Sequence, residues 1–407
     1  MGSSAADLDP IEALASEAVP ATRRLAAIAW VSFVLIGWAG LMVPSLIRSI
    51  KSEFAQPDSG IGLFYLVAAI FYAVGSFGGG LVTERTGRRP VLAVAAVLLG
   101  VGLALQAFAP TWPVFLLAAA PAGLGSGVVD GGMNGLVLDL FRRRPGGALN
   151  LLHLGFSVGA ASAPIVIGQL VGAGVDWRSI FVVTAVWAVV IGVLFGLHVM
   201  PSGRHDRSAA SASPKGLGRA PILPLVALAL AIAFYVSSEI GVSSWLVRFL
   251  DEASNDVATA TLGLFWGGLA VSRLLAARIA DRFPPVLFAG TCALGAAAAL
   301  VGAVAAPSLN LSIVLFVLSG FAFGPVYPMI MAIGGALYPH RIAAVTGALA
   351  GSAVVGGLVY PPLMGLISDQ AGIHVAMYGA SLLAFACAGA LAVAGAGARR
   401  LTAAAPT

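Results

Sequence analysis

Long apolar runs separated by short polar breaks follow one another along almost the whole chain. Each run reaches the roughly 20 residues that an α-helix needs to cross the hydrocarbon core of a bilayer. The runs lack the two-residue alternation of barrel strands, so helices are favoured. Bounded by charges, Pro or Gly, twelve helical spans are predicted, at residues 25–48, 60–82, 90–109, 113–141, 148–172, 178–199, 221–249, 257–281, 285–306, 309–338, 342–367 and 372–396.

The composition agrees with a membrane protein. Of 407 residues, 59% are hydrophobic and 10% are charged, whereas soluble domains average roughly 45–50% apolar and about 25% charged residues. Charge this sparse cannot cover a water-facing surface, which argues against a soluble enzyme, a disordered chain and a secreted disulfide scaffold. The predicted fold class is an all-α membrane protein with twelve transmembrane helices, embedded in a lipid bilayer.

The charged residues lie almost wholly in the breaks between the spans. The net charge of +5 therefore indicates membrane orientation and not a nucleic-acid partner. Because Lys and Arg are retained on the cytoplasmic side, the protein is predicted to be a multi-pass protein of the cytoplasmic membrane with both termini in the cytoplasm. Only four of the 22 basic residues fall in the predicted outer loops, namely Arg48, Lys51, Arg178 and Arg248.

Polar stretches at the ends and in the middle divide the chain. Residues 1–22 carry four acids and are predicted to form a disordered cytoplasmic tail, unlike the basic start of a signal peptide. Two six-helix bundles are expected, at 23–200 and 221–398. The cytoplasmic linker 201–220 joins them, and 399–407 form a second cytoplasmic tail. The two cysteines lie in apolar runs without paired spacing, so neither a disulfide nor a metal site is expected.

An internal repeat relates the two predicted bundles. Residues match at a constant offset of 197, as in Glu84 with Asp281, Arg85 with Arg282, Gly123 with Gly320, Gly127 with Gly324, Arg144 with Arg341, Pro164 with Pro361 and Gly168 with Gly365. Chance matches of Gly are common in such a chain, but charges and prolines matching at one offset are not. The repeat indicates a duplication and predicts a site between two bundles that rock against each other.

A loop motif, GLVTERTGRR, stands at Gly80–Arg89 between the second and third spans. Glu84 at the helix end can accept hydrogen bonds from the start of a neighbouring helix, while Arg85 and Arg88 are expected at the lipid headgroups. The motif resembles the loop signature of the major facilitator superfamily, G-x-L-A-D-R-x-G-R-K, with Glu in place of Asp.

A degenerate copy of this motif, Ala280–Pro285, occupies the same loop of the second half, with Asp281 and Arg282 at the matching positions. The resemblance implies that the charged residues of both loops form a gating latch and do not bind substrate. The alternative is a merely basic inner loop.

Asp130 and Asn134 lie four residues apart in the fourth span, hence on one helical face. Asp130 is about 11 residues, or roughly 16 Å of helix, from the predicted inner end, near mid-membrane. A carboxylate there is costly unless it is protonated, paired or wet. A ligand or proton role and a structural ion pair both remain open, and His153 in the fifth span is equally compatible with packing and with substrate contact.

The pattern D-x-x-x-N, an inner loop and then L-N-x-x-H resembles the fucose–proton symporter branch of that superfamily, which includes sugar carriers. Tyr235–Trp245, with Glu239, and Phe265–Arg273 resemble further motifs of the branch. The branch carries an acid four positions before a proline of the first span, whereas Gly40–Pro44 has none. Met42 in that stretch matches Glu239 at the repeat offset, so Glu239 is the candidate to supply the missing charge.

Arg273 is the one basic residue well inside a predicted span. A guanidinium cannot plausibly deprotonate there and needs a partner. Its depth is similar to that of Asp130, which predicts an attraction between the two that helps hold the inner side shut. The alternative is that Arg273 pairs with a loop acid such as Asp139 or with backbone carbonyls.

Gly159–Gly168 in the fifth span looks like the G-x-x-x-G-P-x-x-G-G motif of proton–drug antiporters, with Ala163 where Gly is expected. Small residues and a proline also simply let helices approach and bend, which is the packing interpretation. No phosphate loop ends in Lys-Ser or Lys-Thr, and no nucleophile elbow is present, so the chain is not expected to be an enzyme.

These features predict a secondary carrier of a small polar solute, a sugar or polyol, working by alternating access as a monomer without a cofactor. Proton coupling through Glu239 or Asp130 is a hypothesis. The residues expected at the substrate are Trp38, Trp266 and Tyr327, stacking on the sugar, and Asp130, Asn134, Asn150 and Glu239, bonding its hydroxyls. His153 and Arg273 are assigned to proton coupling or gating. The alternatives are a proton-coupled exporter of lipophilic compounds and a non-transporting membrane receptor or scaffold.

Overall fold

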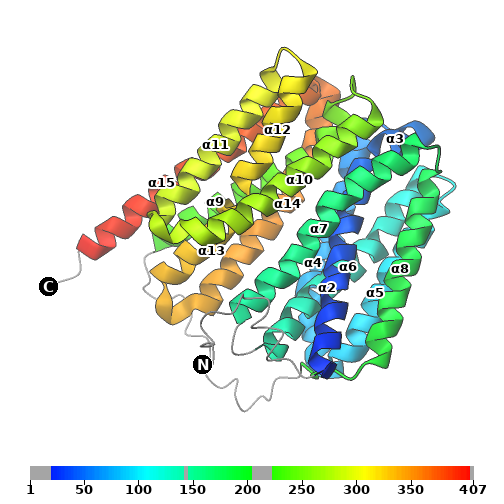
Figure 1. Cartoon of the computed structure of the whole chain (residues 1–407), viewed down its shortest axis with the longest axis horizontal. Helices are drawn as coiled ribbons and strands as arrows, with labels where there is room; N and C mark the ends of the chain where they lie inside the picture. The colour runs from blue at the N-terminus through cyan, green and yellow to red at the C-terminus, as the bar shows by residue number, and fades with distance from the viewer. Residues whose placement is uncertain (1–19, 142–144, 204–221, 404–407) are drawn as a thin grey trace, which may run out of the picture. The chain divides into compact units, whose positions relative to one another are not determined.

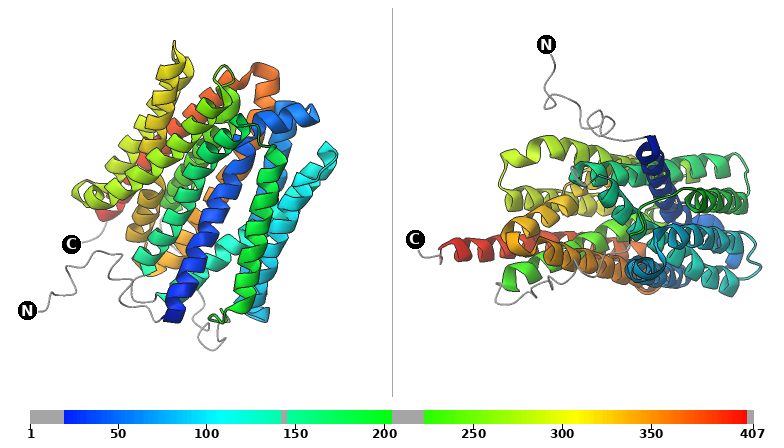
Figure 2. Two further views of the ribbon diagram at one scale, coloured as in Figure 1. Left: turned by 45° about the vertical axis from the view of Figure 1, so that its right-hand side comes forward. Right: turned by 90° about the horizontal axis from the view of Figure 1, so that it is seen from below.

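The structure is a computed structural model that describes residues 20–141, 145–203 and 222–403. All regular structure in these residues is helical, as two further views also show (Figure 2). The α-helices (Figure 1) are α2 (Pro20–Ser45), α3 (Ile47–Phe54), α4 (Asp58–Thr86), α5 (Arg88–Ala107), α6 (Trp112–Leu140), α7 (Pro145–Gly172), α8 (Trp177–Leu197), α9 (Ile222–Phe249), α10 (Asn255–Ile279), α11 (Pro285–Ala305), α12 (Leu309–Phe323), α13 (Val326–Leu337), α14 (Ile342–Ala371) and α15 (Ile373–Ala403). Two short 3₁₀ turns, η1 (Ala280–Arg282) and η2 (Pro339–Arg341), precede α11 and α14.

The predicted all-α membrane fold is confirmed. Within the described residues, 12 helical segments are long and apolar enough to cross a membrane, and they coincide with the predicted spans. One difference lies after the first span, which ends at Ser45. A separate short helix, α3, follows it and has a strongly one-sided pattern in which Ile47 and Ile50 are buried.

The second difference is a break inside the tenth predicted span, between α12 and α13 at Gly324 and Pro325. A proline inside a helix removes one backbone hydrogen bond and its ring clashes with the carbonyl four residues earlier. A second proline, Pro328, leaves the carbonyl of Gly324 without its ordinary helical donor. The sequence prediction treated the whole run as one helix because hydropathy alone does not register these breaks.

Contacts group the chain into two compact units. Unit 1 comprises the described residues within Met1–Gly40, Val67–Ser162 and Val175–Asp206, and unit 2 those within Leu41–Leu66, Ala163–Gly174 and Arg207–Thr407. In unit 1, α5 packs against both α6 and α8. In unit 2, α9 packs against α14 and α15, and α11 packs against α12 and α15.

The predicted bundle boundaries, 23–200 and 221–398, stay predictions. Most of the predicted linker 201–220 and the greater part of the tail 1–22 lie outside the described residues. The last helix, α15, continues to Ala403 and so extends into the segment predicted as a second tail.

Close helix contacts support the internal repeat. A Cβ on Gly127 of α6 would lie 2.1 Å from the carbonyl oxygen of Tyr72 in α4, and a Cβ on Gly324 would lie 2.5 Å from that of Leu269 in α10. Both members of the first pair map onto the second at the offset of 197. Gly123 and Gly320 make the same kind of contact. The duplicated glycines therefore let equivalent helices approach to backbone distance in each half.

The glycines of the fifth span also have packing partners. A Cβ on Gly159 would lie 2.0 Å from the carbonyl oxygen of Val34 in α2. A Cβ on Gly168 would lie 1.8 Å from Oγ1 of Thr259 in α10. These contacts support the packing interpretation of this motif.

Candidate functional site

Asp130 is the centre of a polar cluster in unit 1. It lies on α6 and accepts a hydrogen bond from the hydroxyl of Tyr72 on α4. Asn134, one turn later on α6, donates to Oδ1 of Asp130 at 3.2 Å and to its backbone carbonyl at 3.0 Å. The imidazole of His153 on α7 interacts with the carboxylate electrostatically. Three helices thus supply partners to one intramembrane carboxylate.

A glycine, Gly127, brings the helices of this cluster close together. Because Gly127 has no side chain, α6 lies against the backbone of α4 at Tyr72, and the tyrosine hydroxyl can reach Asp130 one turn further along. Sequence reasoning did not identify Tyr72. The available signal was a phenol inside an apolar span, where a hydroxyl needs a hydrogen-bond partner.

His153 and Asn150 lie near the start of α7, and both are exposed in the isolated chain. The ring of His153 packs edge-on against Phe33, with centroids 5.3 Å apart. His153 therefore combines a packing contact with proximity to Asp130, which keeps both predicted roles open. Asn150 stays a predicted substrate contact.

Glu239 is the centre of a second cluster, in unit 2. Its side chain is 6% exposed and accepts a hydrogen bond of 2.7 Å from the hydroxyl of Tyr235, one turn earlier on α9. Nη2 of Arg273 on α10 lies 3.8 Å from Oε1 of Glu239. This carboxylate therefore has a fixed positive charge beside it.

Arg273 also donates from Nε to the carbonyl oxygen of Gly324 at 3.1 Å. This is the carbonyl that Pro328 leaves without a helical donor, so the guanidinium replaces the missing hydrogen bond at the α12–α13 break. The backbone-carbonyl alternative for Arg273 is confirmed. Asp139, the suggested loop acid, instead pairs with Arg88 at 2.8 Å, and the pairing of Arg273 with Asp130 stays a prediction.

The aromatic residues predicted to stack on a sugar have different surroundings. Trp266 is 3% exposed and its indole nitrogen donates to Oγ of Ser243 at 3.3 Å. Tyr327 lies beside Tyr235, with ring centroids 6.3 Å apart. Trp38, in unit 1, donates to Oγ1 of Thr184 at 3.1 Å. The stacking role of all three stays a prediction, and Tyr327 is the one adjacent to the Glu239 cluster.

The inner-loop motif of unit 1 departs from expectation at Arg88. Whereas Glu84 and Arg85 are exposed, Arg88 is 5% exposed and is covered by other parts of the chain. Its ion pair with Asp139 and its hydrogen bond to the carbonyl of Pro201, at 3.3 Å, compensate its charge. Its own backbone N–H donates to Ser202. The expected place of Arg88 at the lipid headgroups stays a prediction, and the sequence did not indicate its burial against the acid at the end of α6.

In the second half, Asp281 and Arg282 form part of the turn η1. Arg282 is exposed, while the side chain of Asp281 lies outside the described part. The gating role of these loop residues stays a prediction.

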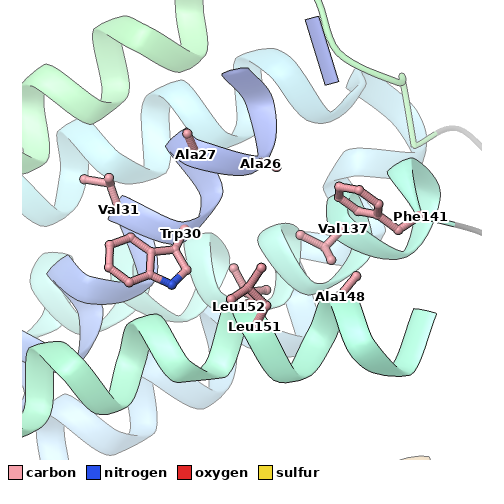
Figure 3. A pocket seen from close by; sticks show the side chains of 9 residues that line it. All are labelled: Ala26, Ala27, Trp30, Val31, Val137, Phe141, Ala148, Leu151 and Leu152. Carbon is pink, nitrogen blue, oxygen red and sulfur yellow. The ribbon is translucent and has the colours of Figure 1, made fainter. Parts of the chain in front are cut away.

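One pocket, of about 360 Å³, lies within unit 1 between α2, the end of α6 and the start of α7 (Figure 3). Its lining residues are Ala26, Ala27, Trp30, Val31, Val137, Phe141, Ala148, Leu151 and Leu152. The indole nitrogen of Trp30 is the one polar side-chain atom in this lining. None of the predicted substrate residues lines it, so it is a separate, apolar feature.

Comparisons with known proteins agree on the family. The model of the Major Facilitator Superfamily matches residues 25–290 and 228–404. The gentisate transporter of Corynebacterium glutamicum is 25% identical over 364 residues, covering 85% of this chain and 81% of the relative. The sodium-dependent glucose transporter 1A of Mus musculus is 24% identical over 292 residues, covering 63% of this chain and 69% of the relative.

The fold agrees as well. The crystal structure of a bacterial homolog to the human lysosomal transporter Spinster, in an inward-facing and occupied conformation, has a TM-score of 0.76 at 16% identity, covering 93% of this chain and 98% of that chain. The resemblance inferred from the loop motif is therefore confirmed, and the chain belongs to the major facilitator superfamily.

Proposed function

We propose that this membrane transporter carries a sugar or a related polyol by alternating access, coupled to protons through Asp130. The proposal keeps the predicted topology, with both termini in the cytoplasm, and a monomeric protein. The observation that carries it is the pair of intramembrane carboxylates, Asp130 and Glu239, each of which accepts a hydrogen bond from a tyrosine hydroxyl.

The charges of the two clusters favour a neutral solute. Arg273 is half-buried, with 29% of its side chain exposed, and Glu239 beside it offsets its charge. An anionic solute would have to compete with Glu239 for this guanidinium. A polyol needs several converging donors and acceptors but no counter-charge, and Asp130, Asn134 and Tyr72 supply them within unit 1.

The different surroundings of Glu239 and Asp130 favour Asp130 as the carboxylate that takes up and releases the proton. Glu239 lies next to Arg273, a cation whose charge does not change with pH. Asp130 has the neutral donors Tyr72 and Asn134 and the titratable His153 around it. Gain and loss of a proton therefore change the charge of the Asp130 cluster, which is the property that a proton-coupled carrier requires.

A second candidate is export of lipophilic compounds. It is favoured by the apolar pocket of unit 1, which can hold a lipophilic solute without hydrogen bonds (Figure 3). The two candidates differ in the residues that they use, since the polyol proposal depends on Asp130 and Glu239 and the export proposal on Trp30 and its neighbours.

A ligand screen on the purified protein distinguishes them. We expect neutral hexoses or hexitols to raise the thermal unfolding midpoint, because a ligand that binds only the native state stabilises it by about 2.7 kcal/mol at 100 times its dissociation constant. The parallel samples contain gentisate, the solute named for one relative, and tetraphenylphosphonium as a lipophilic cation.

Glu239→Gln is expected to lose the shift caused by the sugar. Asp130→Asn, which can still accept the hydrogen bond from Tyr72, is expected to keep it, as is Glu252→Gln, which neutralises an exposed acid. A shift by tetraphenylphosphonium that survives Asp130→Asn and Glu239→Gln and disappears in Trp30→Ala would replace the polyol proposal by the export proposal. Stabilisation by gentisate alone would identify an organic acid as the solute and contradict the argument from charge.

A further inference from the structure

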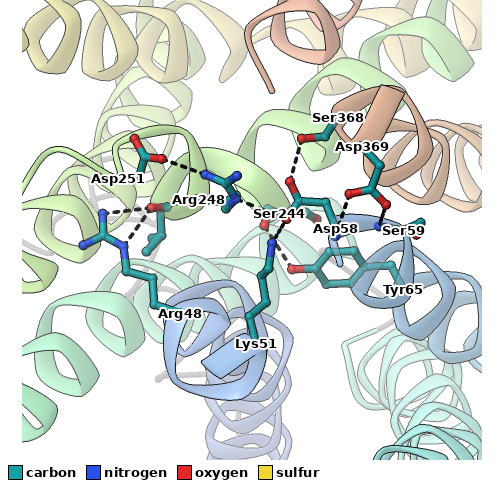
Figure 4. A network of polar contacts seen from close by, with 11 residues as sticks. Arg48, Lys51, Asp58, Ser59, Tyr65, Ser244, Arg248, Asp251, Ser368 and Asp369 are labelled. Carbon is teal, nitrogen blue, oxygen red and sulfur yellow. Dashed lines mark hydrogen bonds and ion pairs between the residues drawn. The ribbon is translucent and has the colours of Figure 1, made fainter. Parts of the chain in front are cut away.

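Three of the four basic residues in the predicted outer loops meet in one network within unit 2 (Figure 4). Arg48 and Lys51 come from α3, and Arg248 comes from the end of α9. The acids of the network are Asp58 at the start of α4, Asp369 near the end of α14 and Asp251 just after α9, which pairs with Arg248 at 2.8 Å. α3 and α4 belong to the first half of the repeat and α9 and α14 to the second half, so the network joins the two halves.

Asp58 is the most heavily paired carboxylate of the network. Its side chain is 4% exposed and contacts Lys51 directly. Nε of Arg248 lies 3.1 Å from Oδ1 of Asp58, and the hydroxyl of Ser368 on α14 donates to Oδ2 at 2.6 Å. Burial makes such a group strongly dependent on its partners, because an unpaired buried charge is costly.

Asp369 binds the first turn of α4. Its two carboxylate oxygens accept the backbone N–H groups of Asp58, at 3.0 Å, and Ser59, at 2.9 Å. These N–H groups have no partner within their own helix. A carboxylate at a helix N-terminus also interacts favourably with the helix dipole. A residue of the second half therefore caps a helix of the first half.

Arg48 makes the opposite kind of cap. Its guanidinium donates to the carbonyl oxygens of Val247, Leu250 and Ala253 around the end of α9. Such C-terminal carbonyls lack donors within the helix, and a cation complements the negative end of the dipole. Partial burial and Arg248 lower the pKa of Arg48 while Asp251 raises it, and the guanidinium remains charged at neutral pH.

Tight packing lies next to the charged network. A Cβ on Gly365 of α14 would lie 2.5 Å from the carbonyl oxygen of Asp58, and one on Gly62 of α4 would lie 2.6 Å from that of Pro362. The hydroxyl of Tyr65 donates to the carbonyl of Ser244 at 3.0 Å, and its ring packs edge-on against Trp245. Backbone contacts this close leave no space for a solute between these helix ends.

We propose that this network is the outer latch of the transporter, formed when the outer side is closed and broken when it opens. Opening has to separate α3 and α4 from α9 and α14, which removes both caps and exposes Asp58 to water at once. The latch lies at the opposite end of α4 from the loop motif at Glu84. The proposal rests on transport by alternating access but not on the identity of the solute.

Thiol labelling tests the latch without a solute. The reporter is Ser244→Cys on α9, at a position that is 5% exposed, in the full chain with Cys292→Ser and Cys387→Ser. Right-side-out membrane vesicles are treated with a membrane-impermeant maleimide. We expect slow labelling of this parent, and labelling about tenfold faster or more after Asp58→Asn or Asp369→Asn, since loss of one strong partner shifts the population toward the open state.

The matched control is Asp176→Asn. Asp176 is also a predicted outer acid, and it caps α8 in unit 1 by accepting the N–H of Arg178 at 3.0 Å. Asn caps a helix as well as Asp does, so labelling is expected to stay slow. Asp369→Glu, which keeps the charge, is expected to label close to the parent rate, and unfolding midpoints of all variants identify any that fail to fold.

Equal labelling rates for the parent, Asp58→Asn and Asp369→Asn would overturn the latch, as would equally fast labelling of Asp176→Asn. Because no solute is present, the result is independent of the ligand screen. A protein that binds no sugar but opens after Asp369→Asn contradicts the proposed function and supports the latch.

Discussion

Replacing Asp130 by Asn is expected to abolish accumulation of the transported solute driven by a pH gradient while leaving downhill exchange of the solute in place. Asn has nearly the same shape and can still accept the hydrogen bond from Tyr72, so the cluster of α4, α6 and α7 is preserved. It cannot take up a proton, and the charge of the site no longer changes through the cycle. Uptake into vesicles with and without a pH gradient measures this difference, using the solute that the ligand screen identifies.

Glu252→Gln serves as the control for this experiment, because it removes the charge of an exposed acid and is expected to accumulate the solute normally. If Asp130→Asn accumulates the solute as well as the parent does, Asp130 is not the proton carrier. If exchange is lost as well, Asp130 acts in binding the solute, and the assignment of the proton has to be moved.

Removing the guanidinium of Arg273 is expected to cause the largest loss of stability. Arg273→Ala leaves Glu239 buried without its cation and the carbonyl of Gly324 without its donor. Breaking a buried pair by removing one partner costs roughly 3–5 kcal/mol. The thermal unfolding midpoint in detergent should fall accordingly, and much of the loss should be recovered in Arg273→Ala/Glu239→Gln, where no buried charge remains.

Arg24→Ala removes an exposed arginine near the start of α2 and should leave the midpoint unchanged, since exposed charges contribute little. A double variant that is less stable than Arg273→Ala would argue against the pair. In that case the role of Arg273 would be confined to the α12–α13 break.

The fold was predictable because hydrocarbon restricts the choices. Apolar runs of the right length must be helices, and the offset of 197 residues between matching charges, prolines and glycines predicts two equivalent halves. The backbone contacts of Gly127 with α4 and of Gly324 with α10 agree with that repeat. Hydropathy did not find the break at Gly324–Pro325, because the break leaves the apolar character of the run unchanged. It also did not find the separate helix α3, because the charges of Arg48, Lys51 and Glu53 made this segment look like a loop.

The site was predictable only in part. Asp130, Glu239 and Arg273 could be identified because charges inside a span are costly and need a reason. Their partners could not, since the sequence does not state which helix face meets which. Tyr72 reaches Asp130 from 58 positions away, and Arg88 is buried because Asp139 lies at the end of a neighbouring helix. Both facts follow from packing geometry and not from local pattern.

The duplicated halves do not carry the latch twice. At the repeat offset, Asp58 corresponds to Asn255 at the start of α10, and Asp369 corresponds to Gly172 at the end of α7. At the equivalent place α7 packs against α10 through the close approach of Gly168 to Thr259. The counterparts of Asp58 and Asp369 there are uncharged. Outward opening is then expected to differ between the two helix pairs. Separation of α4 from α14 exposes a buried carboxylate to water, whereas α7 and α10 meet through small residues and can tilt against each other.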